Sequence, residues 1–144
     1  MKTIAEAIPH RAPFLLVDEI VSIEGNTIRT RRRADPDDPV FKGHFPGNPI
    51  MPGVLVCESI FQSAAILMAH LLEGAMDNAV PVLTRVSNAK FKHPVKPGDT
   101  FEMDVTFKEK LSNACFFVGV AKVNGKTAVS IEFACAVVAK EVIT

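Results

Sequence analysis

Residues 53–72 read GVLVCESIFQSAAILMAHLL, a run in which apolar side chains fall on nearly every side of a helix. Pro52 stands where a helix can begin and Gly74 where one can end, and nothing between them breaks a helix. The sequence therefore predicts one helix of about 21 residues, or roughly 32 Å. A helix that is apolar on most sides must be covered on several of them, which a single sheet wrapped around it achieves.

Most of the remaining sequence is predicted to form strands. Between residues 101 and 108 apolar and polar side chains alternate, which is typical of a sheet with one buried and one wet face. Asn124-Gly125 joins two apolar runs and is a strong hairpin signal. The predicted strands are residues 14–24, 27–33, 82–92, 101–108, 116–123 and 127–138.

This order of elements predicts an α+β fold of the hot-dog type, in which an antiparallel sheet wraps one long central helix. One helix cannot cover every edge and face of such a sheet. We therefore expect the chain to pair with a second copy of itself as a homodimer.

The composition limits the class of protein. With 144 residues and 48% hydrophobic content, the chain is long enough for one sizeable core, and we expect a single domain over residues 1–144. Equal numbers of basic and acidic residues leave no net charge, so nucleic acid is not an expected partner. Glu58 and His70 interrupt the apolar run, which is interpreted as a buried helix and not as a membrane span.

The start of the chain and the cysteines carry less information. Residues 1–7 lack a cationic segment followed by a long apolar run, so we expect no secretory or transit signal and a cytoplasmic location. Cys57, Cys115 and Cys135 are odd in number and widely spaced, which fits neither a disulfide framework nor a zinc site. We interpret them as small apolar core residues.

The segment before the helix, residues 43–54, reads GHFPGNPIMPGV. Its prolines and glycines predict a loop of fixed shape, since proline fixes φ and glycine permits positive φ. His44 sits in this stiff apolar setting, which suits a general base; the alternative is a loop histidine packed beside proline. His10, His70 and His93 have no such setting and are interpreted as structural.

Glu58 lies early in the predicted helix between apolar neighbours, so its carboxyl faces either the interior or a cavity. A carboxyl kept neutral by desolvation can donate a proton, which makes Glu58 the candidate acid. Gln62, four residues further on, shares its helix face and is expected to orient the carboxyl. The alternative for Glu58 is an interaction with the helix dipole.

The backbone N–H groups of Gly53 and Val54 have no partner inside the predicted helix and can receive a developing oxyanion. The alternative is a glycine that only eases the turn after Pro52. A base, an acid and an oxyanion site together suit β-elimination of water next to a thioester carbonyl. No phosphate-binding loop, dinucleotide motif or metal-ligand cluster is evident, so no cofactor or metal is expected.

These motifs resemble the 3-hydroxyacyl-[acyl-carrier-protein] dehydratases of type II fatty acid synthesis, a family with the hot-dog fold. The resemblance covers nearly the whole chain, and its central motif is long and specific. It is carried by IPHR at 8–11, PFLLVD at 13–18, GHFPG at 43–47, MPGVL at 51–55, Glu58, FK at 91–92, PV at 94–95 and PGD at 97–99.

The resemblance implies that His44 is the base on C2 and that Glu58, from the opposite subunit of a dimer, protonates the leaving hydroxyl. It also implies that the Gly53 amide holds the thioester carbonyl and that the Val54 carbonyl orients the His44 ring. The acyl chain would lie in an apolar tunnel at the dimer interface, with its thioester on acyl carrier protein, and family members also form trimers of dimers. The candidates for a basic rim that receives the carrier are Arg85, Lys90, Lys92 and Lys96.

Several positions depart from the family pattern. Ala12 replaces a common aromatic residue, and Glu58-Ser59-Ile60-Phe61-Gln62 stands where the family reads Glu-Ala-Met-Ala-Gln. The related dehydratase/isomerase branch has Trp at the Phe61 position but Asp where Glu58 stands. Because Phe61 and Ala12 would alter the width of the acyl tunnel, we hypothesise a specialised acyl substrate. The alternatives are a hot-dog thioesterase, a dehydratase with added enoyl isomerase activity, and a non-catalytic acyl-binding subunit.

Overall fold

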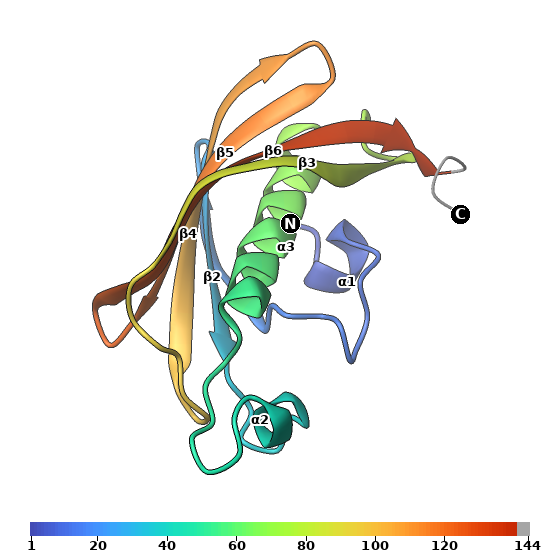
Figure 1. Cartoon of the computed structure of the whole chain (residues 1–144). Coiled ribbons are helices and arrows are strands. Elements are labelled where there is room, and N and C mark those ends of the chain that lie inside the picture. Colours follow the sequence, from blue (N-terminus) through green and yellow to red (C-terminus); the bar gives the residue numbers. More distant parts are fainter. Residues whose placement is uncertain (141–144) are drawn as a thin grey trace.

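A computed structural model describes residues 1–140 of the chain. Its centre is a 19-residue helix, α3 (Gly53–Leu71), which packs against one face of a curved sheet (Figure 1). The helix begins directly after Pro52, as predicted, and ends at Leu71, slightly earlier than Gly74 suggested. By length and composition α3 could cross a membrane, but most of that stretch is buried within the fold.

The sheet has six strands in the order β1-β2-β4-β5-β6-β3, and all neighbouring strands are antiparallel. This confirms the predicted hot-dog arrangement of one antiparallel sheet on one long helix. Asn124 and Gly125 both have positive φ and form the predicted hairpin turn. The strands are β1 (Glu19–Glu24), β2 (Thr27–Arg33), β3 (Ala79–Phe91), β4 (Thr100–Leu111), β5 (Ala114–Val123) and β6 (Lys126–Ala139).

The helix packs directly on the backbone of the sheet at Gly119 in β5. A Cβ atom at this position would lie only 2.3 Å from Cγ2 of Ile60 on α3. Glycine is therefore required here for close helix–sheet contact. Ile60 is fully buried, which places the core between α3 and the inner face of the sheet.

The first strand is shorter than predicted, because residues 14–17 follow α3 instead of pairing in the sheet. The N–H of Leu16 donates to Oε1 of Gln62 at 2.8 Å, and the carbonyl of Phe14 accepts from Gln62 Nε2 at 2.8 Å. The buried side chain of Gln62 thus bonds the backbone N–H and C=O groups that would otherwise pair with a neighbouring strand. β1 begins only at Glu19.

Two short helices were not predicted. α1 (Ile4–Ala7) begins with a capping box in which Thr3 and Glu6 bond each other's backbone, and it lies beside α3 (Figure 1). α2 (Val40–Gly43) precedes the loop that leads to α3.

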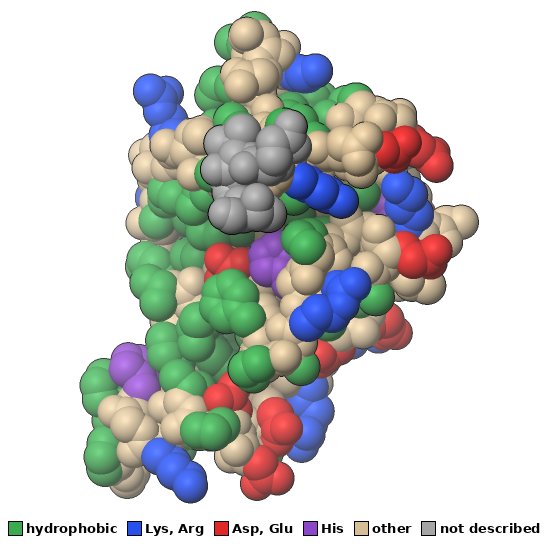
Figure 2. Space-filling view, turned by 90° about the vertical axis from the view of Figure 1, so that its right-hand side faces the viewer, with side chains coloured by type: hydrophobic (Ala, Val, Ile, Leu, Met, Phe, Trp, Pro, Cys, Tyr) green, Lys and Arg blue, Asp and Glu red, His purple; other side chains and the backbone are tan. Residues whose placement is uncertain are grey.

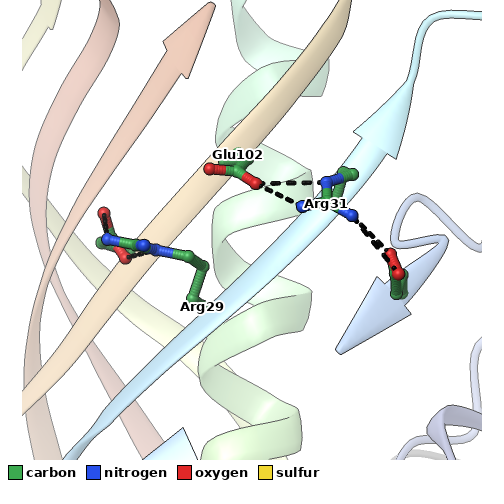
Figure 3. Close-up of polar contacts among 5 residues, drawn as sticks. Arg29, Arg31 and Glu102 are labelled. Atoms are coloured by element: carbon green, nitrogen blue, oxygen red, sulfur yellow. Dashed lines mark hydrogen bonds and ion pairs between the residues drawn. The ribbon is translucent and has the colours of Figure 1, made fainter. Parts of the chain in front are cut away.

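The face of the sheet that points away from α3 carries ion pairs between neighbouring strands. The guanidinium of Arg31 in β2 lies 2.7 Å from a carboxylate oxygen of Glu102 in β4. Figure 3 shows this pair joining the two strands. The guanidinium of Arg29 lies 2.8 Å from Asp104. Exposed pairs of this kind contribute about 0–1 kcal/mol each, so they mark a solvated face more than they hold the fold together.

Candidate active site

His44 directly follows α2 and begins the loop predicted to have a fixed shape. The loop turns at residues 45–48, where the backbone groups of Phe45 and Asn48 exchange hydrogen bonds of 2.9 and 3.1 Å. Pro46 and Gly47 occupy the two central positions, and Gly47 has a φ of 75°. This is the sequence pattern of a type II turn, which needs positive φ at its third residue. The loop is thus held by its own backbone.

The His44 ring is oriented by two neighbours. Its Nδ1 lies 2.8 Å from the carbonyl oxygen of Ile50, and its ring stacks on Phe45 with centroids 4.0 Å apart. The expectation that the Val54 carbonyl orients the ring is wrong for this chain. Ile50 takes that part because the loop folds it back beside the ring, whereas Val54 lies in the first turn of α3 with its residue 69% exposed.

The bond to Ile50 fixes which ring nitrogen is available for chemistry. A carbonyl oxygen only accepts, so Nδ1 carries a hydrogen, and in the neutral ring Nε2 keeps a lone pair. A neutral imidazole with a free Nε2 can take a proton from a carbon acid.

His44 and Gly53 line one cavity of about 340 Å³, together with Phe91 and His93. The N–H groups of Gly53 and Val54 have no hydrogen-bond partner among residues 1–140. A Cβ on Gly53 would lie 2.5 Å from the Phe91 ring, so glycine leaves the room that the ring occupies. The candidate base and the candidate oxyanion donor are therefore brought together within one chain.

Glu58 lines a second, smaller cavity of about 130 Å³, which it shares with Phe61, Gln62 and Cys135. Gln62 donates a hydrogen bond from Nε2 to Oε2 of Glu58 at 3.0 Å, which is the orienting contact expected from their spacing on the helix. Phe61 packs edge-on against Phe133 with ring centroids 4.9 Å apart. The Glu58 side chain is 24% exposed in the single chain.

His10 also lines the Glu58 cavity, and the interpretation of His10 as a purely structural residue missed this. Its Nε2 lies 3.9 Å from Oε2 of Glu58. The two residues are 48 positions apart in the chain, and no periodicity connects them. Only the path of residues 8–17 along α3 brings them together.

The structure thus divides the predicted site into two halves. His44 and Gly53 line the first cavity, whereas Glu58, Phe61 and Gln62 line the second. Val54 lines neither. Within one chain the candidate base and acid do not share a cavity.

The cysteines do not extend the chemistry of the site. All three are buried, as expected for small core residues. Burial, and secondarily the nearby Cys115 and Glu58, raises the pKa of the Cys135 thiol to about 12, so it stays protonated at neutral pH. Among residues 1–140 no group of three His, Cys, Asp or Glu side chains is arranged to hold a metal ion.

Comparison with known proteins gives the family. A protein-family model described as a FabA-like domain matches residues 8–132. A protein of Caulobacter vibrioides named 3-hydroxyacyl-[acyl-carrier-protein] dehydratase FabZ is 44% identical over 140 residues, which cover 91% of this chain and 83% of that protein. A protein of the same name from Aeromonas hydrophila subsp. hydrophila is 36% identical, covering 94% of this chain and 92% of that protein.

Solved structures agree on the fold. The dehydratase heterocomplex ApeI:P from Xenorhabdus doucetiae has a TM-score of 0.81 at 15% identity, covering 98% of this chain and 94% of that one. The PaaI protein of E. coli has a TM-score of 0.66 at 12% identity, covering 82% and 81%. The family match over residues 8–132, together with relatives of similar sequence over nearly their whole length, shows that this chain belongs to the FabA-like domain family.

Proposed function

We propose that this chain is a hydro-lyase that converts (3R)-3-hydroxyacyl thioesters on acyl carrier protein to trans-2-enoyl thioesters in fatty acid or related biosynthesis. Its relatives with 36–44% identity are named as dehydratases of this class. The observation that carries the proposal is the oriented His44, whose Nδ1 is held by Ile50 in a cavity that also contains the unpaired Gly53 N–H. No cofactor is needed for this reaction.

The residues have defined roles in this elimination. Nε2 of His44 removes a proton from C2, while the N–H groups of Gly53 and Val54 receive the negative charge that develops on the thioester oxygen. Glu58 gives a proton to the hydroxyl on C3, the C–O bond breaks, and water leaves as the C2–C3 double bond forms. Solvent then resets the two protonation states. The acyl chain passes Phe61, at the wall of the Glu58 cavity.

The two half-sites are proposed to meet across a dimer, and β3 provides the geometry. The Glu58 cavity is lined by Pro81 and Leu83 near the start of β3, whereas the His44 cavity is lined by Phe91 at its end. β3 is an edge strand of the sheet. Antiparallel pairing of two β3 strands would bring the start of one beside the end of the other, and so place each His44 next to Glu58 of the partner subunit.

The surface along β3 supports this pairing. Leu83, Val86 and Phe91 are 41%, 47% and 57% exposed, which is unusual for large hydrophobic side chains on a long edge strand. Figure 2 shows hydrophobic side chains gathered along one side of the face that carries α1. Such an apolar edge is a template for pairing with another strand.

We also propose how the chain receives its carrier, where it is located and how it assembles. Arg85, Lys90, Lys92 and Lys96 are all exposed on or after β3 and are the proposed rim for the acidic carrier protein. A cytoplasmic location follows from the proposed role in fatty acid or related biosynthesis. The dimer is taken as the catalytic unit, and its further assembly into trimers of dimers is part of the same proposal.

A first experiment tests the reaction. Purified protein is incubated with crotonyl and longer enoyl thioesters on acyl carrier protein and on coenzyme A, and hydration is followed by loss of the enoyl absorbance. We expect hydration without release of free thiol, with a preference for some chain lengths. Release of thiol would instead identify a thioesterase, and formation of a cis-3-enoyl product would add isomerase activity. Equal rates for all chain lengths would reject the specialised substrate.

A second experiment tests the shared site. His44→Ala and Glu58→Gln are each expected to remove most activity. If the site spans two chains, co-expression of the two variants in equal amounts produces mixed dimers with one intact site, and restores about a quarter of wild-type activity. If both residues act within one chain, the mixture stays inactive, because no chain carries both.

A further inference from the structure

His10 occupies a position from which it can act on the proposed acid. Its ring lines the Glu58 cavity and stacks on Phe14 with centroids 6.3 Å apart. Nε2 points to the carboxylate, 3.9 Å from Oε2 of Glu58. This distance is too long for a hydrogen bond, but such contacts in unliganded sites often tighten once substrate binds.

The other ring nitrogen indicates which form of His10 the fold accepts. Nδ1 is buried and has no hydrogen-bond partner among residues 1–140. A protonated ring would bury an N–H without an acceptor, which is costly, whereas a lone pair at the same place costs less. In the neutral ring the structure therefore favours the hydrogen on Nε2, facing Glu58.

A cation and a carboxyl lie near His10. The guanidinium of Arg11 bonds the carbonyls of Ala5, Ile8 and His10 itself, so a positive charge is already adjacent. The titratable groups that line the cavity besides His10 are Glu58 and Cys135. The Cys135 thiol is neutral because burial raises its pKa. Glu58 is therefore the group that the Nε2–H of His10 faces.

Gln62 shows that one oxygen of Glu58 is selected. Oε1 of Gln62 accepts from the N–H of Leu16, so its Nε2 must be the donor, both to the carbonyl of Phe14 and to Oε2 of Glu58. Gln62 and His10 thus face the same carboxylate oxygen, at 3.0 and 3.9 Å. Once the contact from His10 tightens to a hydrogen bond, Oε2 has two donors, and the carboxyl carries its own proton on Oε1.

We propose that His10 is a positioning residue which, together with Gln62, occupies Oε2 of Glu58, so that the proton given to the leaving hydroxyl is held on Oε1. This inference rests on the proposed dehydratase function. It assigns His10 a role in directing the proton and no contact with substrate.

The test compares two substitutions at one position. His10→Leu removes the donor, whereas His10→Gln keeps an N–H at about the place of Nε2. We expect His10→Leu to lower kcat about tenfold, with KM changed less than about twofold, because proton transfer and not binding is affected. His10→Gln is expected to recover most of the loss. His70→Gln, at the other end of α3, is the matched control and should match wild type.

A second readout does not depend on activity. The pKa of Glu58 is measured from the side-chain carboxyl carbon by NMR, with Glu58→Gln identifying the resonance. Loss of a donor to the carboxylate disfavours its charged form, so His10→Leu should raise this pKa and His10→Gln should leave it nearly unchanged. The wild-type His10 ring should show its hydrogen on Nε2 in a long-range proton–nitrogen spectrum, which needs no variant to fold.

The outcomes separate the two proposals. An active wild type with an unchanged kcat and Glu58 pKa in His10→Leu would overturn the role of His10 and leave the dehydratase intact. Equal losses in the Leu and Gln variants, or a hydrogen on Nδ1 in the wild type, would also overturn it. A wild type without hydration activity would reject the proposed function itself.

Discussion

The Nδ1 atom of His44 lies 2.8 Å from the carbonyl oxygen of Ile50, six residues further along the same loop. The contact is local, because both residues belong to one loop of one chain. It leaves Nε2 as the nitrogen that can accept a proton.

We predict that His44 is found with its hydrogen on Nδ1 near neutral pH. A carbonyl cannot donate. In a ring with hydrogen only on Nε2, the lone pair of Nδ1 would therefore face the lone pairs of the Ile50 oxygen, which is unfavourable. Long-range proton–nitrogen NMR of the wild type, with His44→Ala to identify the signals, measures this directly. A hydrogen on Nε2 in the neutral ring would contradict the assignment of this nitrogen as the base.

Replacement of Gln62 by leucine is expected to destabilise the fold as well as the site. The buried amide makes hydrogen bonds to Leu16, Phe14 and Glu58, and the leucine would leave buried backbone groups unpaired. We expect the free energy of unfolding to fall by about 2–4 kcal/mol, measured by urea denaturation. Ser59→Ala is the control on the same helix. Among residues 1–140 its hydroxyl bonds only the Leu55 carbonyl, so the variant should cost less than about 1 kcal/mol.

Gly119→Ala is expected to force α3 away from β5. The new Cβ would lie 2.3 Å from Cγ2 of Ile60, and overpacking of this kind costs about 1–3 kcal/mol. Ile60→Ala alone is expected to cost about 2–5 kcal/mol through the cavity it leaves. In the double variant the truncated side chain at position 60 makes room for the new Cβ. The double variant should therefore lose less stability than the sum of the two single variants. Strict additivity would show that the two positions do not press on each other.

Leu83→Lys is expected to prevent dimerisation through β3 and to abolish activity, while the far-ultraviolet circular dichroism stays that of the folded chain. A charge buried in the proposed interface would be left without a partner. Val21→Lys is the control, because Val21 is 39% exposed on the other edge strand, close to the 41% of Leu83. Sedimentation velocity reports the mass of both variants. A Leu83→Lys protein that remains dimeric would place the interface elsewhere.

The buried thiols predict a loss of stability at alkaline pH. Burial raises the pKa of Cys57, Cys115 and Cys135, the last to about 12, whereas the pKa of an unfolded thiol is about 8.5. The unfolded chain therefore loses protons first. This contribution to stability is fully present below the unfolded pKa and is lost as the pH rises toward the folded one.

Cys135→Ala tests this contribution by urea denaturation at pH 7 and at pH 10 under reducing conditions. Between pH 7 and pH 10, we expect the free energy of unfolding to fall by about 1–2 kcal/mol less in the variant than in the wild type. Equal losses in the two proteins would mean that this thiol ionises as readily in the folded chain as in the unfolded one.

The sequence alone determined the features that depend on neighbouring residues. The period of the apolar side chains predicted α3 and the alternating strand β4, and Asn124-Gly125 predicted the hairpin between β5 and β6. The contact between Gln62 and Glu58 was also predictable, because side chains four residues apart on a helix are neighbours. All of these features depend on residues that lie close together in the sequence.

The tertiary structure alone decided which distant residues meet. It ended the first strand early by giving the backbone of residues 14–16 to a helix side chain, set His10 beside Glu58, and placed the His44 and Glu58 cavities at opposite ends of β3. Local periodicity carries no information on such contacts, because they follow from how the sheet curves around α3 and from which buried groups compete for the same hydrogen bonds.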